Sequence, residues 1–382
     1  MWQTIVRIHP HELFKVWTQE DVRTHEEILQ IGVGYLLVPW ALLALWWGIG
    51  ILRSAKAPAK EDLPAIAVWL GVAAVIVSLP FWIGADILPG GIPVYGYGSM
   101  LFIGVFVAAW RAAVRGSRVG VDPDIIWDMA MWVFFLGIVG ARLFYVIQYH
   151  DRVFGGKSGF DLVKAFVNLP DGGLVLYGGV LMAVATFFVV CRIRKLNPLI
   201  MADVVIPSFF IGLAFGRFGC FLNGCCYGDV CELPWAVSFA RGSVPFEAMV
   251  NRGLLDAAAA TSTPLHPTQI YSTLNALVLA FLTASYFRVR HRDGSVFALG
   301  LIVYPLTRFV IEFLRSDELG QFETTLTISQ WVSLGLFCLG LLFLAWLNKR
   351  PTTSQGTSSS NVAVASSAEP DWTTKRKKIA RG

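Results

Sequence analysis

Long apolar runs dominate this chain of 382 residues and decide what it can fold into. A helix that crosses a bilayer needs about 20 predominantly apolar residues. The expected spans are residues 31–52, 65–88, 97–113, 126–148, 174–191, 204–223, 269–287, 296–313 and 326–347. Hydrophobic residues make up 55% of the chain and charged residues only 15%, which excludes an ordinary soluble domain. We therefore predict an all-α, polytopic membrane protein with about nine transmembrane helices.

Lysine and arginine gather in alternate connections between these runs, which predicts the orientation of the chain. The basic clusters lie at residues 53–60, 111–118, 192–195, 288–292 and 349–350. Cytoplasmic loops carry an excess of lysine and arginine. We expect the N-terminus outside and the C-terminus in the cytoplasm. The net charge of +5 mostly reflects these anchors, and no basic face interleaved with aromatic residues indicates nucleic-acid binding.

The composition changes along the chain predict three regions. Residues 1–91 form an N-terminal extension with two transmembrane helices, and the apolar residues between positions 2 and 17 are interpreted as an interfacial amphipathic helix. Residues 92–348 form a seven-helix core that includes an extracytoplasmic head at 224–265. Residues 349–382 are a disordered, basic cytoplasmic tail that we expect to contact anionic membrane lipids.

Charged side chains recur within the apolar runs, at similar depth in different helices. Arg308, Glu312 and Arg315 follow one another at i, i+4 and i+7, while Arg142 and Arg217 lie towards the outer ends of two other helices. Charges at such depth face one another or a cavity. The arginines outnumber the single glutamate, so the group requires an anion. A phospholipid headgroup is the anion present at this depth, and guanidinium groups pair with phosphate through two donors.

Each of these residues also has a structural interpretation that the sequence leaves open. Arg308 and Glu312 could form an internal ion pair, and Arg142 could bond a carbonyl at a helix end. Tyrosines such as Tyr177 at helix ends often belong to the interfacial belt. His266 precedes a proline at a helix start and could be only a cap.

Four cysteines cluster where the sixth expected helix ends. Their spacing, Cys220, Cys225, Cys226 and Cys231, contains no C-x-x-C pair, so the pattern favours neither a metal site nor a disulfide oxidoreductase. Structural disulfides are the favoured interpretation on the extracytoplasmic side, and a reactive thiol is the alternative. The sequence indicates no cofactor.

The segment from Gly216 to Gly228 resembles the signature of the prolipoprotein diacylglyceryl transferases. The matching residues there are Gly216, Arg217, Gly219, Phe221, Asn223, Gly224 and Gly228. Other motifs follow the same order as in that family. They are Tyr97-Gly98-x-Met100, Gly140-Ala141-Arg142-Leu143-x-Tyr145, Gly172-Gly173 with Tyr177-Gly178-Gly179, His266-Pro267-Thr268-Gln269-Ile270-Tyr271, Arg308-Phe309-x-x-Glu312-Phe313-x-Arg315 and Ser329-Gln330. The resemblance covers roughly residues 92–348.

This resemblance implies an enzyme of lipoprotein biosynthesis in the bacterial inner membrane. Such an enzyme moves the diacylglyceryl group of phosphatidylglycerol to the lipobox cysteine of a preprolipoprotein, and glycerol phosphate leaves. By the same resemblance, Arg217 contacts the lipid phosphate and Arg308 neutralises the leaving phosphate with support from Arg142. Tyr97 and Asn223 position the lipid. Gly219, Gly228 and Glu312 complete the implied lipid-binding set.

Three positions depart from the family pattern as the resemblance gives it. Tyr177 stands where the family has histidine, Cys220 where it has asparagine, and Cys225 where it has glutamate. The phenol of Tyr177 is a poor substitute for a histidine base, because an unperturbed phenol titrates near pH ~10. His266 is therefore a second candidate for the base that accepts the thiol proton. Two other functions stay open: a non-catalytic relative that binds or transports phospholipid, and a membrane thiol-redox protein.

Overall fold

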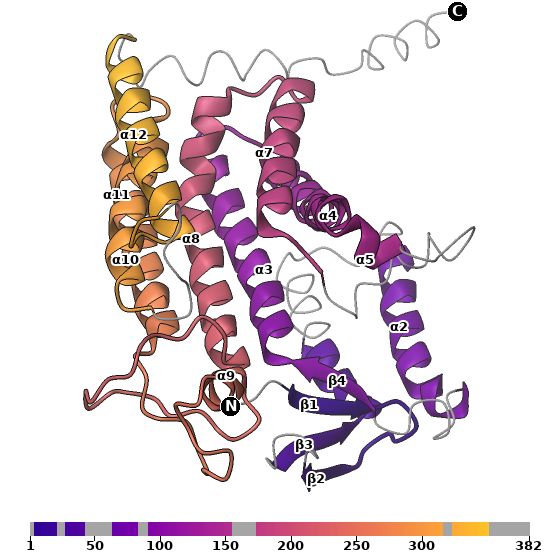
Figure 1. Cartoon of the computed structure of the whole chain (residues 1–382). Coiled ribbons are helices and arrows are strands. Elements are labelled where there is room, and N and C mark those ends of the chain that lie inside the picture. The colour runs from indigo at the N-terminus through magenta and orange to yellow at the C-terminus, as the bar shows by residue number, and fades with distance from the viewer. Residues whose placement is uncertain are drawn as a thin grey trace, which may run out of the picture. The chain divides into compact units, whose positions relative to one another are not determined.

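Seven long helices dominate the part of the protein that a computed structural model describes (Figure 1). The structure describes residues 4–20, 27–42, 63–82, 91–154, 173–315 and 323–350. The helices are α3 (Gly96–Ser117), α4 (Pro123–Gln148), α7 (Leu176–Ile193), α8 (Pro198–Asn223), α10 (Thr268–Val289), α11 (Ser295–Glu312) and α12 (Ile328–Asn348). All seven are long and apolar enough to cross a membrane. The mostly helical, polytopic class is confirmed, and each helix begins and ends within a few residues of its predicted span.

The N-terminal region contains helical residues in both expected spans, although the first helix begins later than predicted and is described only for residues 33–42. The helix α2 (Leu63–Trp82) covers most of the second expected span. The first expected span begins instead with the last residues of a strand, β3 (Glu27–Gly32), and a 3-10 helix, η1 (Val33–Leu36). Residues 43–62, and with them the rest of that span, lie outside the described residues, as does the predicted tail beyond residue 350.

A four-stranded sheet replaces the predicted amphipathic helix. The strands β1 (Thr4–His9), β2 (Val16–Glu20), β3 and β4 (Ile92–Tyr95) lie in the order β2-β3-β1-β4. β1 runs parallel to β3 and antiparallel to β4. The segments are rich in β-branched residues, which favour a pleated surface over a helix. β4 leads directly into α3, so the sheet fixes where that helix begins.

The contacts between residues divide the chain into two compact units. The first consists of Met1–Phe102, Gly216–Ile270 and Leu314–Asp317. The second consists of Ile103–Phe215, Tyr271–Phe313 and Glu318–Gly382.

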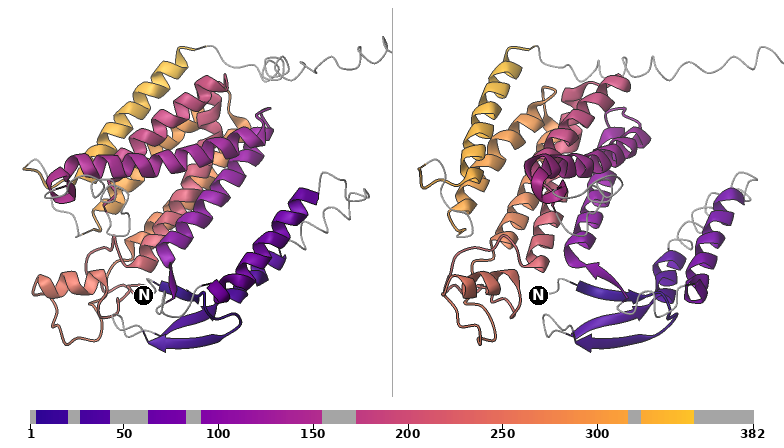
Figure 2. Two further views of the ribbon diagram at one scale, coloured as in Figure 1. Left: turned by 90° about the vertical axis from the view of Figure 1, so that its right-hand side faces the viewer. Right: turned by 45° about the vertical axis from the view of Figure 1, so that its right-hand side comes forward.

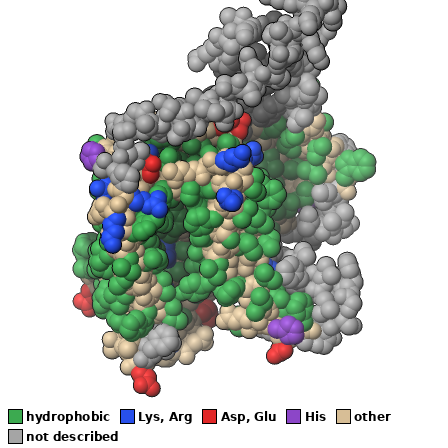
Figure 3. All heavy atoms as spheres, turned by 90° about the horizontal axis from the view of Figure 1, so that it is seen from above, with side chains coloured by type: hydrophobic (Ala, Val, Ile, Leu, Met, Phe, Trp, Pro, Cys, Tyr) green, Lys and Arg blue, Asp and Glu red, His purple; other side chains and the backbone are tan. Residues whose placement is uncertain are grey.

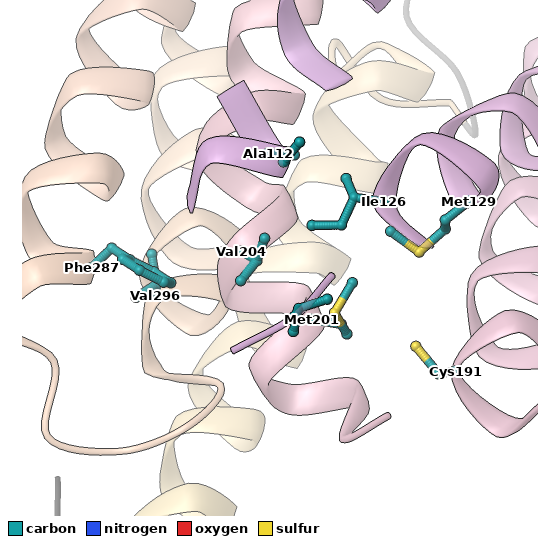
Figure 4. Close-up of a cluster of buried hydrophobic side chains, with 10 residues drawn as sticks. Ala112, Ile126, Met129, Cys191, Met201, Val204, Phe287 and Val296 are labelled. Carbon is teal, nitrogen blue, oxygen red and sulfur yellow. The ribbon is translucent and has the colours of Figure 1, made fainter. Parts of the chain in front are cut away.

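The second unit has a hydrophobic core of buried side chains from six helices. Figure 4 shows eight of them: Ala112, Ile126, Met129, Cys191, Met201, Val204, Phe287 and Val296. Within this unit α4 packs against α7 (Figure 2), and two glycines, Gly140 and Gly178, lie where the helices meet. A Cβ at Gly140 would lie 2.6 Å from the carbonyl oxygen of Gly178. Small residues at this crossing let the two backbones approach closely, as is common between membrane helices.

The buried Asp203 side chain of the second unit is satisfied by the start of a helix. The Asp203 carboxylate accepts hydrogen bonds from the backbone N–H of Gly294 at 2.8 Å and of Phe297 at 2.9 Å, at the start of α11. A carboxylate is favourable at a helix N-terminus because unpaired N–H groups point at it. Figure 3 shows lysine and arginine side chains gathered on one face among hydrophobic ones.

Residues 224–265 of the first unit form a small head with a core of its own. Tyr227, Phe239, Met249 and Leu265 pack together there. The short helix α9 (Val244–Asn251) contributes Met249 to this core, and isolated bridges join Leu265 to Val230 and Val237. The predicted head is thus a folded segment.

Candidate functional site

The end of α8 turns sharply back, and this turn belongs to the first unit. α8 ends at Asn223, and Gly224 adopts a left-handed conformation with φ of +75°. Glycine favours this conformation, which often closes a helix C-terminus. Cys226 is also left-handed, with φ of +59°, although it carries a side chain. A left-handed non-glycine residue costs about 1–2 kcal/mol, so other contacts hold this turn in place.

The turn brings three cysteine sulfurs together. The Sγ atoms of Cys220, Cys225 and Cys226 lie within 4.8 Å of one another, and all three residues are half-buried. We call these three residues the thiol cluster. Cys231, four residues beyond Tyr227, is buried in the head and does not belong to it.

The predicted disulfides are not formed: all six cysteines lie in the described residues and all are free thiols. The thiol cluster contains an odd number of sulfurs, so one of them would stay unpaired even if the other two were joined. The spacing along the chain, which favoured no metal site, does not show this proximity of the three sulfurs. A helix turn followed by a left-handed turn places the three sulfurs together without any C-x-x-C pair.

Two buried side chains at the start of α10 hold the backbone of the thiol cluster. The Thr268 hydroxyl donates to the carbonyl of Cys226 at 2.8 Å, and the Gln269 amide donates to the carbonyl of Cys225 at 2.8 Å. Both side chains are almost completely buried. Thr268 and Gln269 were not predicted to be functional residues, because their partners are backbone carbonyls far away in the sequence.

Arg217 and Arg315 place positive charge close to the thiols. Arg217 is half-buried on the last turns of α8, and Arg315 follows the end of α11. Hydrogen bonding to Cys220, and next to Cys225, lowers the pKa of the Cys226 thiol well below its usual range. The charges of the two arginines lower that pKa further. The thiolate, which is the nucleophilic and metal-binding form, is therefore favoured at Cys226.

Tyr97 comes next to this turn because α3 packs against Gly219. A Cβ at Gly219 would lie 3.2 Å from Cδ2 of Tyr97 and 3.3 Å from Cβ of Met100. The Tyr97 side chain is 41% exposed and lies within electrostatic range of Arg217 and of the thiol cluster. The structure thus brings Tyr97, Gly219 and Arg217 together in the first unit. Asn223 is a hydrogen-bond partner of Cys225 in the same turn.

Backbone hydrogen bonds join the segment around Gly228, which follows the turn, to the segment around His266. The Gly228 N–H donates to the His266 carbonyl at 2.9 Å, and the His266 N–H donates to the Asp229 carbonyl at 2.9 Å. A Cβ at Gly228 would lie 2.6 Å from Cβ of His266. The lack of a side chain at Gly228 therefore allows the two backbone segments to pack closely, and His266 contributes its backbone to this contact.

In the second unit, Arg308 and Glu312 form the ion pair that the sequence left open as a possibility. Nη2 of Arg308 lies 2.6 Å from Oε2 of Glu312, one turn further along α11. The hydroxyl of Thr327 donates to Oε1 of Glu312 at 3.1 Å. Glu312 is only 2% exposed, so its charge is buried and compensated from two sides. Glu312 thereby fixes the position of the Arg308 guanidinium.

Arg142 and Tyr177 belong to neighbouring parts of the α4–α7 pair. Nη1 of Arg142 donates to the Gly173 carbonyl at 3.0 Å, just before α7 begins, and its guanidinium lies 5.3 Å from the Tyr145 ring centre. Arg142 is buried and bonds a carbonyl near a helix end, as its structural interpretation proposed. Tyr177, in the first turn of α7, is 52% exposed.

The residues that resemble the family signature thus lie in one turn of a helical membrane protein. Known proteins with similar sequences indicate the family of this chain. The family model described as prolipoprotein diacylglyceryl transferase matches residues 85–346. The chain belongs to this family. The matched stretch contains all seven long helices except the last residues of α12, and it leaves out β1, β2, β3 and α2.

Three relatives carry the name phosphatidylglycerol--prolipoprotein diacylglyceryl transferase. The protein from Clostridium tetani is 34% identical over 251 residues, which are 66% of this chain and 92% of the relative. The protein from Rhodopirellula baltica is 28% identical, over 74% of this chain and 78% of its own length. A protein from Streptomyces coelicolor, whose name carries the additional number 1, is 32% identical over 69% of this chain and 72% of its own length.

Proposed function

We propose that this protein transfers the diacylglyceryl group of phosphatidylglycerol to the lipobox cysteine thiol of a prolipoprotein. The observation that carries this proposal is the end of α8, where the half-buried Arg217 of the signature-like segment lies within electrostatic range of Tyr97 at the start of α3. A positive charge held in an apolar helix suits the phosphate of an anionic lipid. The relatives' names specify the same two substrates.

The reaction needs charge stabilisation more than it needs a nucleophile from the enzyme. The attacking thiol belongs to the prolipoprotein, and negative charge develops on the glycerol phosphate that leaves. A guanidinium that is already in place when this charge develops lowers the barrier. We assign this role to Arg217, with Tyr97 and Asn223 positioning the lipid.

Arg308 is proposed to neutralise phosphate charge as well. Its guanidinium is fixed by the buried Glu312 at 2.6 Å, so little side-chain freedom is lost when an anion binds. Glu312 is then a positioning residue rather than a lipid contact. Arg142, held by the Gly173 carbonyl, supports the start of α7.

We further propose that residues 224–265 and the N-terminus lie on the extracytoplasmic side of the bacterial inner membrane and that the tail lies in the cytoplasm. The helices α3, α7 and α10 each carry an arginine in the last turn, namely Arg115, Arg192 and Arg288. These ends are the cytoplasmic ones by the excess of positive charge. The thiol cluster then lies at the outer surface, where prolipoproteins are expected after export.

A phospholipid-binding relative without transferase activity is the second candidate. The observations that favour it are Tyr177, Cys220 and Cys225, which depart from the family pattern that the resemblance implies. Complementation separates the two candidates. The full chain should restore growth and lipoprotein lipidation in a bacterial strain depleted of its own diacylglyceryl transferase. Membrane expression without rescue would favour the lipid-binding candidate.

A further inference from the structure

The thiol cluster is a preformed arrangement of soft ligands. Three Sγ atoms lie within 4.8 Å of one another in a turn held by buried Thr268 and Gln269. Cys226 is kept in a left-handed conformation that a side chain normally avoids. Such strain tends to persist at functional sites, where the surrounding structure supports it. An ordinary surface turn has no need of these restraints.

Three thiolates and an open position make the donor set of a catalytic zinc site. Zinc binds sulfur at about 2.3 Å and takes four ligands in a tetrahedron, so its sulfurs lie roughly 3.8 Å apart. Side-chain rotation could bring the three Sγ atoms to this separation from their present one. Structural zinc sites have four protein ligands, whereas catalytic ones keep one position for water or substrate. Among the described residues, the only group of three or more metal-binding side chains found within such a distance is this one.

We propose that Cys220, Cys225 and Cys226 bind one zinc ion, whose fourth position takes the lipobox thiol of the prolipoprotein and activates it. This inference rests on the proposed transferase function and adds a mechanism to it. A thiol that coordinates zinc loses its proton. The metal would therefore supply the thiolate that the reaction requires, in a chain that has Tyr177 where the family resemblance implies histidine.

The step balances without any oxidant or reductant. The lipobox thiol displaces a zinc-bound water and gives its proton to solvent. The thiolate sulfur then attacks the glyceryl carbon that carries the phosphate, forming a C–S bond as the C–O bond breaks. The electron pair of that bond leaves with glycerol phosphate. The thioether product is a weaker zinc ligand than a thiolate, so it departs and water returns.

The charges around the cluster suit this role. Zinc with three thiolates carries a net charge of −1, and a bound substrate thiolate makes it −2. Arg217 and Arg315 act electrostatically on Cys226 and would offset this charge. The same Arg217 would attract the lipid phosphate, which places the electrophilic carbon near the bound sulfur.

Metal analysis of the purified full chain tests the site itself. After purification in detergent with lipid, we expect elemental mass spectrometry to find about one zinc ion per chain. Cys226→Ser and the double variant Cys220→Ser/Cys225→Ser should lose the zinc. Cys231→Ser and Cys338→Ser should retain it, because Cys231 lies in the head core and Cys338 is exposed on α12. Zinc that is absent from the wild type, or unchanged in the cluster variants, would overturn the proposal.

Cobalt substitution tests whether the fourth position takes the substrate thiol. A Co²⁺-loaded chain absorbs in the near ultraviolet in proportion to the number of bound thiolates. A lipobox peptide with cysteine should raise this absorption to roughly four-thirds of its starting value, as three thiolates become four. The same peptide with serine should leave it unchanged. Equal spectra with both peptides would show that the metal does not bind the substrate.

A third set of variants separates this inference from the proposed function. The triple variant Tyr177→His/Cys220→Asn/Cys225→Glu restores the residues that the resemblance gives for the family. We expect it to bind no zinc, yet to lipidate at least ten times faster than Cys220→Ser/Cys225→Ser. Lipidation by wild type that survives chelation, with no zinc bound, would refute the metal site and leave the transferase function intact. Zinc binding without any lipidation would support the metal site but refute the proposed function, and with it the role in thiol activation.

Discussion

Arg217 is the residue on which the proposed chemistry depends most. It lies half-buried at the end of α8, beside the thiol cluster. Replacing it with alanine should lower kcat/KM for prolipoprotein lipidation by about 10²-fold or more, because a fixed charge at the leaving phosphate is lost. Arg217→Lys should retain part of the rate, since lysine keeps the charge without the paired donors. Arg241→Ala, an exposed arginine of the head, is the matched control; an equal loss there would contradict the assignment.

Glu312 offers a test of stability at the residue scale. Glu312→Ala would leave the half-buried Arg308 guanidinium without its buried carboxylate partner, which should destabilise the protein by roughly 3 kcal/mol. Thermal unfolding in detergent measures this change. The double variant Arg308→Met/Glu312→Leu should recover much of the stability, because two buried charges are replaced by apolar groups.

Activity separates the two roles of this ion pair. The double variant should stay inactive even where it is stable, since the proposed phosphate-binding charge is gone. Recovery of lipidation together with stability would show that Arg308 has only a structural role.

At the scale of elements, Gly178 sets how closely α4 and α7 pack. A Cβ there would collide with the side chain of Phe144 and the carbonyl of Gly140. Gly178→Ala should therefore push the two helices apart and destabilise the protein by about 1–3 kcal/mol. Gly335→Ala in α12 is the control, because a Cβ there meets nothing within 4 Å and alanine favours a helix. A lower unfolding midpoint for Gly335→Ala than for Gly178→Ala would contradict this account.

The elements that the sequence predicted are those defined by local composition. Each of the seven long helices is an apolar run, so length alone locates it. The sheet was not predicted, because β1 pairs with β4 far along the chain and short strands leave only a weak local signal. The thiol cluster was named, but its geometry was not foreseen. That geometry depends on the left-handed backbone of Gly224 and Cys226 and on the hydrogen bonds from Thr268 and Gln269.

At the scale of the whole molecule, the proposed orientation makes a topological prediction. Three long helices separate the head at 224–265 from residue 349, so the two should lie on opposite sides of the membrane. In intact cells, a membrane-impermeant thiol reagent should label a cysteine introduced at the exposed position Leu254→Cys in a variant without native cysteines. It should not label Asn348→Cys. Labelling of both positions, or only of Asn348→Cys, would contradict the orientation.

Transfer of lipid by the purified protein tests the central claim most directly. The full chain is reconstituted in bilayers that contain phosphatidylglycerol and supplied with a peptide bearing a lipobox cysteine. Mass spectrometry should show the peptide gaining one diacylglyceryl group, with glycerol phosphate released. Bilayers of phosphatidylcholine alone, and the Arg217→Ala variant, should give little or no product. An unmodified peptide with a folded wild-type chain, or equal product from both lipids, would contradict the account.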